Sequence, residues 1–418
     1  MRRSEIWLYV ALGLAVHAGA RAGVLDAPGS DLVVSLVTYG PGAIYWERFG
    51  HDAIRMRDRT SGESEDFNYG VFDFEDSAFI WNFARGHMRY MIDAESSQTD
   101  QQDYMDEGRS VLEQQLALSP AQAANLRAFL AWNLRPEHLS YDYDYLTSNC
   151  ATRIRDVLNS VLGGALQPIL TGRPAPLTYR QQIDRLMRPR LWLMLGMDFG
   201  LGPSADHPLN EWQESFLPMV LAREISTVRI PDDGGGVKPL VASALQTAPN
   251  RVTPPDPMPP NLDVPLGLAG LGLAVTMLAL RLRLPTLCAA LSVAYLVIAG
   301  IAGTVLLALW TLTAHHAAWA NANLLVFNPL AFALLIPVWR ARYGVLYRRR
   351  AWLLLALQIA AAFLALLLHI LPGATQQNLP WLLFAIPVWL AVTVGVTSPV
   401  TNSRPTKTIR RRIEHPGS

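Results

Sequence analysis

Five long apolar runs in the second half of the chain limit what this sequence can fold into. They cover residues 264–280, 286–310, 322–339, 351–371 and 380–397. A helix that crosses the hydrocarbon core of a bilayer needs about 20 predominantly apolar residues. The third and fifth runs contain proline, which leaves their ends less sharply defined than the others. The sequence therefore predicts a transmembrane domain of about five helices over residues 264–400.

Basic residues between these runs predict the orientation of the domain. Arg281 and Arg283 lie between the first two runs, five arginines lie between residues 340 and 350, and the tail at 401–418 is basic. The intervening loops at 311–321 and 372–379 contain no lysine or arginine. Since positive charge stays on the cytoplasmic side, everything before Val264 faces outward. We expect a multi-pass protein of the cytoplasmic (inner) membrane.

The N-terminus has the pattern of an export signal, which agrees with this orientation. Residues 1–22 combine a basic start, an apolar stretch at 6–16 and a small-residue end suited to cleavage. An uncleaved signal anchor is the alternative, and both place the next domain outside. The overall charge of +1 is an average over two parts of the chain with very different compositions, before and after Val264. It therefore gives no reason to expect a nucleic-acid partner.

Between the signal and the membrane domain we expect an exported domain at 23–230 and a Pro/Gly-rich linker at 231–263. Proline-rich chain is extended and semi-rigid. Within the exported domain, β-branched and apolar runs predict strands at 31–39, around 44–57 and at 66–74, with a hairpin between the last two. Helical periodicity follows at 96–115, 119–134 and 150–162. This order indicates an α+β fold.

Cys150 is the residue in this domain most suited to chemistry. The only other cysteine, Cys288, lies in an apolar run, so Cys150 has no disulfide partner in its own exported domain. Ser148 and Asn149 are good N-cap residues and place Cys150 in the first turn of a helix. The free N–H groups and the dipole there favour the thiolate.

A cysteine nucleophile needs a base, and four histidines are available in the exported domain. They are His51, His87, His138 and His207. Spacing alone does not select among them, and His87 is a rival to His51. Strand alternation also raises a difficulty, because Ile54 and Met56 would point to the face opposite His51.

Other chemistries lack their sequence signals. There is no HxxxH, HExxH or CxxC pattern, no glycine-rich phosphate loop after a strand and no serine nucleophile elbow. A short acidic group, Asp73, Glu75 and Asp76, is typical of a solvated turn. We expect neither a metal nor a cofactor.

Several separated sequence blocks along this chain form a distinctive set. They are Tyr39-Gly-Pro-Gly42, Trp46, Arg48-Phe-Gly-His-Asp-Ala-Ile-Arg55, Phe67-Asn-Tyr-Gly-Val-Phe-Asp-Phe74, Asn149-Cys-Ala-Thr-Arg153, Gly196-Met-Asp-Phe-Gly-Leu-Gly202, Phe216-Leu-Pro218, Trp319-Ala-Asn-Ala-Asn323 and Phe327-Asn-Pro-Leu330. These blocks resemble, in the same order, one family of exported-domain membrane proteins, the bacterial lipoprotein N-acylation transferases that form lyso-lipoproteins (the Lnb-like family). The resemblance extends from about residue 30 to 400.

The resemblance implies a permuted papain-like, NlpC/P60-related exported domain, in which the histidine strand precedes the cysteine helix. It selects His51 over His87. The chain departs from the expected Asp-Asn-Cys motif at Ser148, which implies that the electrostatic role of that aspartate is absent or moved to Asp144.

The resemblance also implies a thiol acyl transfer with Cys150 as nucleophile and His51 as base. Asn68, with Tyr69 behind it, is the candidate that orients the histidine, and the backbone N–H of Cys150 is a candidate oxyanion donor. Five further residues are candidates for binding substrate: Tyr45, Trp46, Asn149, Arg153 and Arg55.

Three functions remain open at this point. The first is an acyltransferase that moves an acyl chain from the diacylglyceryl group of a lipoprotein to its N-terminal amine. The second is a cysteine hydrolase of peptidoglycan peptides or phospholipid esters. The third is a non-catalytic module that binds lipids or envelope partners.

Overall fold

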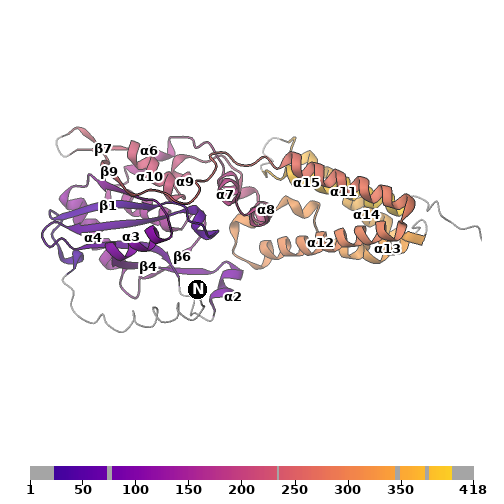
Figure 1. Cartoon of the computed structure of the whole chain (residues 1–418), viewed down its shortest axis with the longest axis horizontal. Coiled ribbons are helices and arrows are strands. Elements are labelled where there is room, and N and C mark those ends of the chain that lie inside the picture. The colour runs from indigo at the N-terminus through magenta and orange to yellow at the C-terminus, as the bar shows by residue number, and fades with distance from the viewer. Residues whose placement is uncertain (1–22, 73–77, 233–234, 344–348, 372–375, 398–418) are drawn as a thin grey trace, which may run out of the picture. The chain divides into compact units, whose positions relative to one another are not determined.

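The computed structural model describes residues 23–72, 78–232, 235–343, 349–371 and 376–397 (Figure 1). The predicted signal at 1–22, the basic tail at 401–418 and the acidic group Asp73, Glu75 and Asp76 lie outside the described residues. The chain divides into two compact units. The sheet unit comprises the chain up to Phe79, Met88–Ala175 and Leu209–Pro255; the membrane unit comprises Ile80–His87, Pro176–Pro208 and the chain from Asp256.

The sheet unit is built on one antiparallel sheet of seven strands in the order β6-β4-β3-β2-β1-β5-β9. The strands are β1 (Leu32–Tyr39), β2 (His51–Asp58), β3 (Ser64–Val71), β4 (Met88–Ser96), β5 (Val111–Leu116), β6 (Ser140–Tyr143) and β9 (Val241–Ala248). A separate hairpin pairs β7 (Arg229–Pro231) with β8 (Val237–Pro239). The predicted hairpin is present, since β2 pairs with β3.

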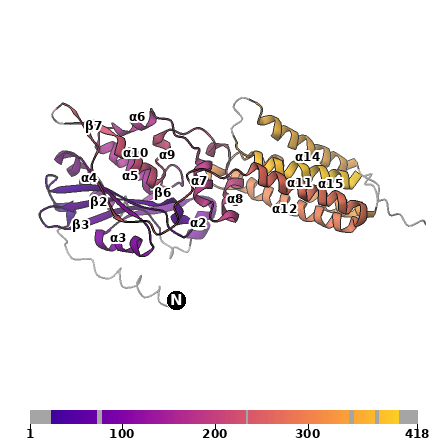
Figure 2. The same cartoon turned by 45° about the horizontal axis from the view of Figure 1, so that its top comes forward.

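Helices cover both faces of this sheet, as Figure 2 shows with α3 on one side and α5 and α10 on the other. They are α3 (Ser97–Asp106), α4 (Pro120–Asn133), α5 (Cys150–Val161), α6 (Leu166–Thr171), α9 (Glu211–Glu214) and α10 (Pro218–Thr227). The larger core lies on the α5 face and includes Ile54, Met56 and Phe67. A smaller core on the α3 face includes Tyr39 and Ala53.

Two segments differ from the sequence prediction. The helix expected over 96–115 ends at Asp106, because Gly108 has a positive φ of 78°, a conformation that favours glycine and ends a helix. The chain then turns back as β5. Part of the predicted linker at 231–263 also belongs to the sheet, since β9 pairs with β5 along its length. Membership of the sheet depends on pairing with β5, which is remote in the chain, and local composition does not predict such pairing.

The membrane unit confirms the five predicted spans. They are α11 (Asp263–Arg283), α12 (Pro285–Leu312), the segment Ala322–Tyr343, α14 (Arg349–Leu368) and α15 (Leu379–Thr397). Three shorter helices belong to the same unit: α2 (Phe79–Arg85), α7 (Tyr179–Met187) and α8 (Leu191–Gly200). The unit has its own apolar core, which includes the fully buried Trp389.

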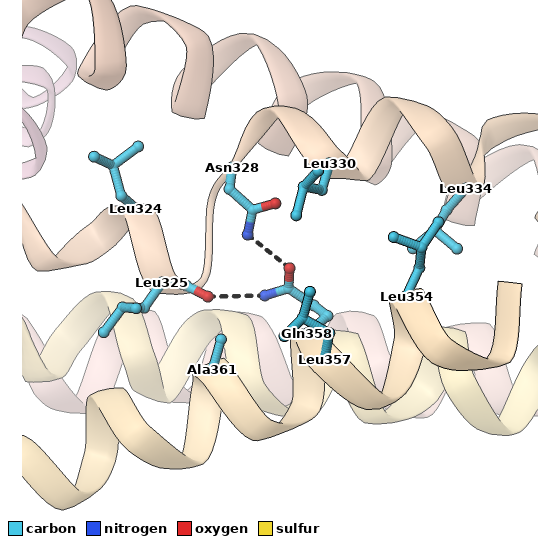
Figure 3. A pocket seen from close by; sticks show the side chains of 9 residues that line it. All are labelled: Leu324, Leu325, Asn328, Leu330, Leu334, Leu354, Leu357, Gln358 and Ala361. Atoms are coloured by element: carbon cyan, nitrogen blue, oxygen red, sulfur yellow. Dashed lines mark hydrogen bonds between the residues drawn. The ribbon is translucent and has the colours of Figure 1, made fainter. Parts of the chain in front are cut away.

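The third span is not one continuous helix. It consists of η5 (Ala322–Leu325), η6 (Pro329–Leu334), α13 (Leu335–Arg340) and η7 (Ala341–Tyr343), with Asn328 in an extended conformation. Pro329 explains the break, because proline disfavours helix at the residue before it. The Leu325 carbonyl beside the break accepts a hydrogen bond from Nε2 of Gln358 at 2.9 Å, and Oε1 of Gln358 accepts one from Asn328 at 2.7 Å (Figure 3).

We predict that Gln358→Leu destabilises the membrane unit. The substitution leaves the Leu325 carbonyl and the Asn328 amide without their partner in apolar surroundings, which costs about 1–3 kcal/mol. The measurement is the unfolding midpoint in mixed detergent micelles, with Leu357→Met on the same helix as the control. A loss of stability no larger than that of the control would contradict the prediction.

Candidate active site

Cys150 is the first residue of α5, and a reciprocal cap holds the helix start. Asn149 Oδ1 accepts from the backbone N–H of Thr152 at 3.0 Å, and Thr152 Oγ1 accepts from the backbone N–H of Asn149 at 2.7 Å. The Asn149 amide also donates to the carbonyl of Phe216. The predicted capping role of Asn149 is confirmed. Ser148 does not cap the helix, since its hydroxyl donates to the Asp142 carbonyl.

The Cys150 thiol lies against the ends of β2 and β3. The backbone N–H groups of Asp52 and Ala151 lie close enough to the thiol to lower its pKa. A Cβ built on Gly70, near the end of β3, would lie 3.9 Å from the Cβ of Cys150. The thiol therefore lies near the backbone of Asp52, the residue that directly follows His51.

His51 begins β2, and the turn before it requires glycine. Gly50 has a φ of 82°, and a Cβ there would lie 3.0 Å from the Tyr39 carbonyl oxygen. The His51 ring lies nearly parallel to that of Tyr104, with centroids 5.8 Å apart. Its position in the chain and its ring packing thus give it a defined orientation.

A hydrogen bond from His51 to Asn68 determines which ring nitrogen of His51 is left unprotonated. His51 Nε2 and Asn68 Oδ1 are 2.9 Å apart. The Asn68 amide is oriented by its own Nδ2, which donates to Asp100 Oδ1 at 3.2 Å. Because Asn68 presents its oxygen, Nε2 of His51 carries the proton and Nδ1 is left as the base. Among the described residues, no hydrogen bond joins His51 directly to Cys150.

The double-sided cover of the sheet resolves the difficulty raised by strand alternation. Ile54 and Met56 do point to the α5 face, as alternation requires. His51 and Ala53 point to the α3 face, which has its own core. No bulge at the start of β2 is needed. Tyr69, expected behind Asn68, lies instead on the α5 face, where its hydroxyl donates to Asn133, because neighbouring strand residues face opposite sides.

Behind Asn68, a buried polar network reaches the middle of β2. The Tyr39 hydroxyl donates to Asp100 at 2.6 Å and to Asp66 at 3.0 Å. Arg55 holds both oxygens of Asp66, each at 2.7 Å. Such a network holds its members rigidly when every group is paired. It fixes Asn68, and through Asn68 it fixes the ring of His51.

This network bears on Arg55 as a substrate-binding candidate. Besides Asp66, its guanidinium donates to Glu113 and Gln101, and the residue is buried. Its charge is compensated inside the protein, so we do not carry it forward as a ligand for an anionic head group. Asp144, the suggested replacement for the missing aspartate, holds the turn before α5 by accepting from Leu146 and Thr147.

Burial keeps the thiol and the imidazole neutral. It raises the pKa of Cys150 to about 12, an effect that the Asp52 charge reinforces and that the surrounding N–H groups and Arg109 only partly oppose. Burial also lowers the pKa of His51 to about 4, despite the hydrogen bond that the ring donates to Asn68. The expectation of a thiolate at the helix start is therefore wrong, because desolvation outweighs the helix terminus.

Two charged groups near the thiol were missed in the sequence. Asp52 is fully buried: Oδ1 accepts from the Thr38 hydroxyl at 2.6 Å, while Oδ2 has no partner within the described part of the chain. Arg109 donates to the Gly40 carbonyl and lies over the ring of Tyr104. The only feature of the sequence that could have pointed to Asp52 is its position directly after His51. No feature of the sequence pointed to Arg109, because it lies within the stretch predicted as helix.

The remaining candidates occupy different surroundings. Tyr45 and Trp46 are exposed and pack edge to face. Arg153 lies over the rings of Tyr141 and Tyr69, at 4.8 and 5.5 Å from their centroids. His87, the rival histidine, belongs to the membrane unit, whereas His51 shares the sheet unit with Cys150.

The other two histidines have ordinary partners. His138 stacks on Trp132, and His207 Nδ1 lies 2.7 Å from the Ser204 carbonyl. Among the residues described, no group of three or more His, Cys, Asp or Glu side chains is arranged to hold a metal ion. The chemistry that this arrangement can support is that of a thiol and an imidazole.

Comparison with known proteins gives two matches to family models. Residues 26–185 match the Lnb N-terminal periplasmic domain, and residues 259–401 match the Lnb transmembrane domain. The matches cover the thiol, the histidine and all five spans. No curated protein and no solved structure matches the chain.

We predict that the reactivity of Cys150 rises steeply across the neutral pH range. In a Cys288→Ala variant, the alkylation rate should increase about tenfold per pH unit from pH 6 to 10 without a plateau, because only the thiolate reacts. The measurement is iodoacetamide labelling followed by mass spectrometry. The same protein unfolded in detergent should level off near the ordinary thiol pKa of about 8.5. A plateau near neutral pH in the folded protein would contradict the burial argument.

We also predict that Asp52→Asn stabilises the protein more at pH 8 than at pH 4. Burial raises the pKa of Asp52 to about 7, so stability falls as the pH rises from about 4, where the unfolded carboxyl ionises, to about 7. Asparagine removes this cost, which is at most roughly 4 kcal/mol for a shift of this size. Thermal unfolding at both pH values measures it, with the exposed Asp93→Asn as the control. An equal effect at both pH values would count against it.

Proposed function

The chain belongs to the Lnb family, and on that premise we propose that it is a thiol acyltransferase acting on membrane lipoproteins. The family and the five spans make it a multi-pass membrane protein with a periplasmic N-terminal domain. In the proposed reaction, Cys150 removes one acyl chain from the diacylglyceryl group of a lipoprotein. The chain then passes to the N-terminal amine of the lipoprotein, which leaves the lyso form.

The observation that carries this proposal is the arrangement at the start of β2. The Cys150 thiol lies near the backbone N–H of Asp52, the residue after His51. The His51 ring is held by Asn68 through Nε2 at 2.9 Å. A thiol, an imidazole whose unprotonated nitrogen is defined and an amide that orients the imidazole are thus grouped around the start of β2, which supports their assignment as nucleophile, base and positioning group.

The neutral resting state favours general-base catalysis over a preformed ion pair. As Sγ of Cys150 attacks the ester carbonyl, Nδ1 of His51 takes the thiol proton. The tetrahedral oxyanion collapses, the carbon–oxygen bond to glycerol breaks, and the leaving glyceryl oxygen receives that proton. The backbone N–H of Cys150, which lacks an intrahelical acceptor at the first helical position, is suited to stabilise the oxyanion.

In the second half of the reaction the amine takes the place of glycerol. The N-terminal amine attacks the thioester carbonyl, and Nδ1 of His51 accepts a proton from the nitrogen. The bond from carbon to sulfur breaks, the sulfur takes the proton back, and an amide remains. Asn68 keeps the ring oriented through both proton transfers and acts as a positioning residue.

An apolar loop beside β2 supports a lipid substrate. Ile44, Tyr45 and Trp46 are all exposed and lie a few residues before His51 in the chain. Exposed large apolar side chains that occur together commonly mark a binding surface. Arg153, which lies about one helical turn after Cys150, is the remaining candidate for binding an anionic head group. A hydrolase of lipid esters would use the same residues with water in place of the amine.

The test is mass spectrometry of lipoprotein N-termini in a host whose lipoproteins keep both glyceryl acyl chains and a free amine. Expression of the wild type and of Cys288→Ala should produce the N-acylated lyso form. Cys150→Ala and His51→Ala should not. Asn68→Ala should reduce product formation by about 10²-fold or more, since general-base catalysis contributes 10²–10⁴.

Each alternative has its own result in this experiment. Lyso-lipoprotein with a free amine would establish the hydrolase. Unchanged lipoproteins, with the protein present in the membrane and folded, would refute both lipid reactions. Activity that persists in Cys150→Ala would exclude the thiol as nucleophile.

A further inference from the structure

Two short helices of the membrane unit expose large apolar side chains that the five spans do not cover. On α2, Ile80 is 80% and Trp81 65% exposed, and on α8, Trp192 is 74% exposed, with Phe83 and Leu191 also exposed. Burying a side chain of this kind contributes about 1.5–3 kcal/mol. Five of them on two helices of 7 and 10 residues indicate a partner rather than free solvent.

The helix α2 is attached to the chain that follows the second span. That span, α12, ends at Leu312. The backbone N–H of Ala314 donates to the Arg85 carbonyl, at the end of α2, at 2.8 Å. A Cβ on Gly86 would lie only 2.8 Å from the backbone of Ala314 and His315, so only glycine permits this approach. The end of α2 therefore contacts the chain two residues after the second span ends.

The helix α8 is attached to the same loop at its other side. The Asn321 amide donates to the carbonyls of Phe199 and Leu201, at 2.9 and 3.0 Å. The backbone N–H of Gly202 donates to the Ala317 carbonyl at 2.7 Å. These bonds satisfy the carbonyls at the C-terminus of α8. Both short helices are thus fixed to residues 313–321, the loop between the second and third spans.

This loop lies at the outer boundary of the membrane. It contains no lysine or arginine, whereas the loops at the opposite ends of the spans are rich in arginine. Trp310, shortly before the loop, and Trp319, within it, are also exposed. Tryptophan is enriched where hydrocarbon meets head groups. The exposed apolar side chains of α2 and α8 therefore belong to helices that are attached to a loop at this boundary.

Exposed arginines flank both helices. Arg85 ends α2, and Arg190 directly precedes α8. A helix that lies in a membrane surface carries tryptophan and aliphatic side chains on one side and basic residues that meet lipid phosphates on the other. The composition of α2 and α8, together with their attachment to the loop at the outer boundary, matches this chemistry.

We propose that α2 and α8 lie in the outer leaflet of the bilayer, parallel to its surface, with Ile80, Trp81 and Trp192 inserted below the phosphates. The two helices form an interfacial anchor that is separate from the five spans. The anchor stands on the membrane unit alone and holds whether or not the proposed acyl transfer is correct. In chain order, α2 lies between β3 and β4.

Depth measurement by spin labels tests the anchor in the full-length protein. Trp81→Cys and Trp192→Cys are made in a Cys150→Ala, Cys288→Ala background, labelled and reconstituted in phosphatidylglycerol–phosphatidylethanolamine vesicles. The depth of each label follows from the ratio of its accessibility to oxygen and to a water-soluble nickel relaxant. This ratio should place both labels about 5–10 Å into the boundary between head groups and acyl chains. Exposed surface positions tolerate such changes with little loss of stability.

The matched control is Trp132→Cys on α4 of the sheet unit, which is 42% exposed and should respond more strongly to the water-soluble relaxant than to oxygen. If the label at 81 or at 192 is as accessible to that relaxant as the label at 132, the anchor is refuted. Thermal unfolding of each labelled protein shows that the fold is kept. Since depth is measured without turnover, failure of the anchor and failure of the acyl transfer give different results.

Discussion

The hydrogen bond between His51 and Asn68 is the interaction on which the candidate site depends. It joins the first residue of β2 to the neighbouring strand β3, at 2.9 Å, and it decides which nitrogen of the ring can accept a proton. Asn68 can do this because Asp100 holds its amide, and Asp100 in turn accepts from Tyr39. The sheet and the α3 layer are therefore part of the candidate site, because they hold the imidazole of His51 in one orientation.

The Cys150 thiol belongs to α5, on the opposite side of the sheet from α3. Its helix packs on the α5 face, and its sulfur lies near the backbone of Asp52 at the start of β2. A seven-stranded sheet with helices on both faces makes this approach possible, because one strand end is reached from two sides. Burial also keeps the thiol and the imidazole neutral, so in the proposed reaction charge develops only when a substrate carbonyl is attacked. A thiolate with no substrate present would be exposed to oxidation.

The membrane unit follows different physics. In hydrocarbon every backbone group needs a partner inside the protein, and the broken third span meets this need with Gln358 and Asn328. At the outer boundary, asparagine side chains fasten α8 to the loop between two spans. Buried ion pairs add to this, since Arg180 holds Asp206 at 2.6 Å. A unit so closely joined can carry exposed apolar helices without losing its own fold.

The sequence alone determined the five spans, their orientation, the α+β class and the helix start at Cys150, because these follow from local periodicity, charge and capping residues. It also indicated His51 and Asn68, through resemblance to a family. Tertiary structure decided that β9 joins the sheet, that α3 ends before β5 and that Tyr69 faces away from Asn68. It alone revealed Asp52 and Arg109 beside the thiol and the protonation state of the pair. These depend on which groups burial brings together from distant parts of the chain, and desolvation there outweighs the local preference of a helix start for charge.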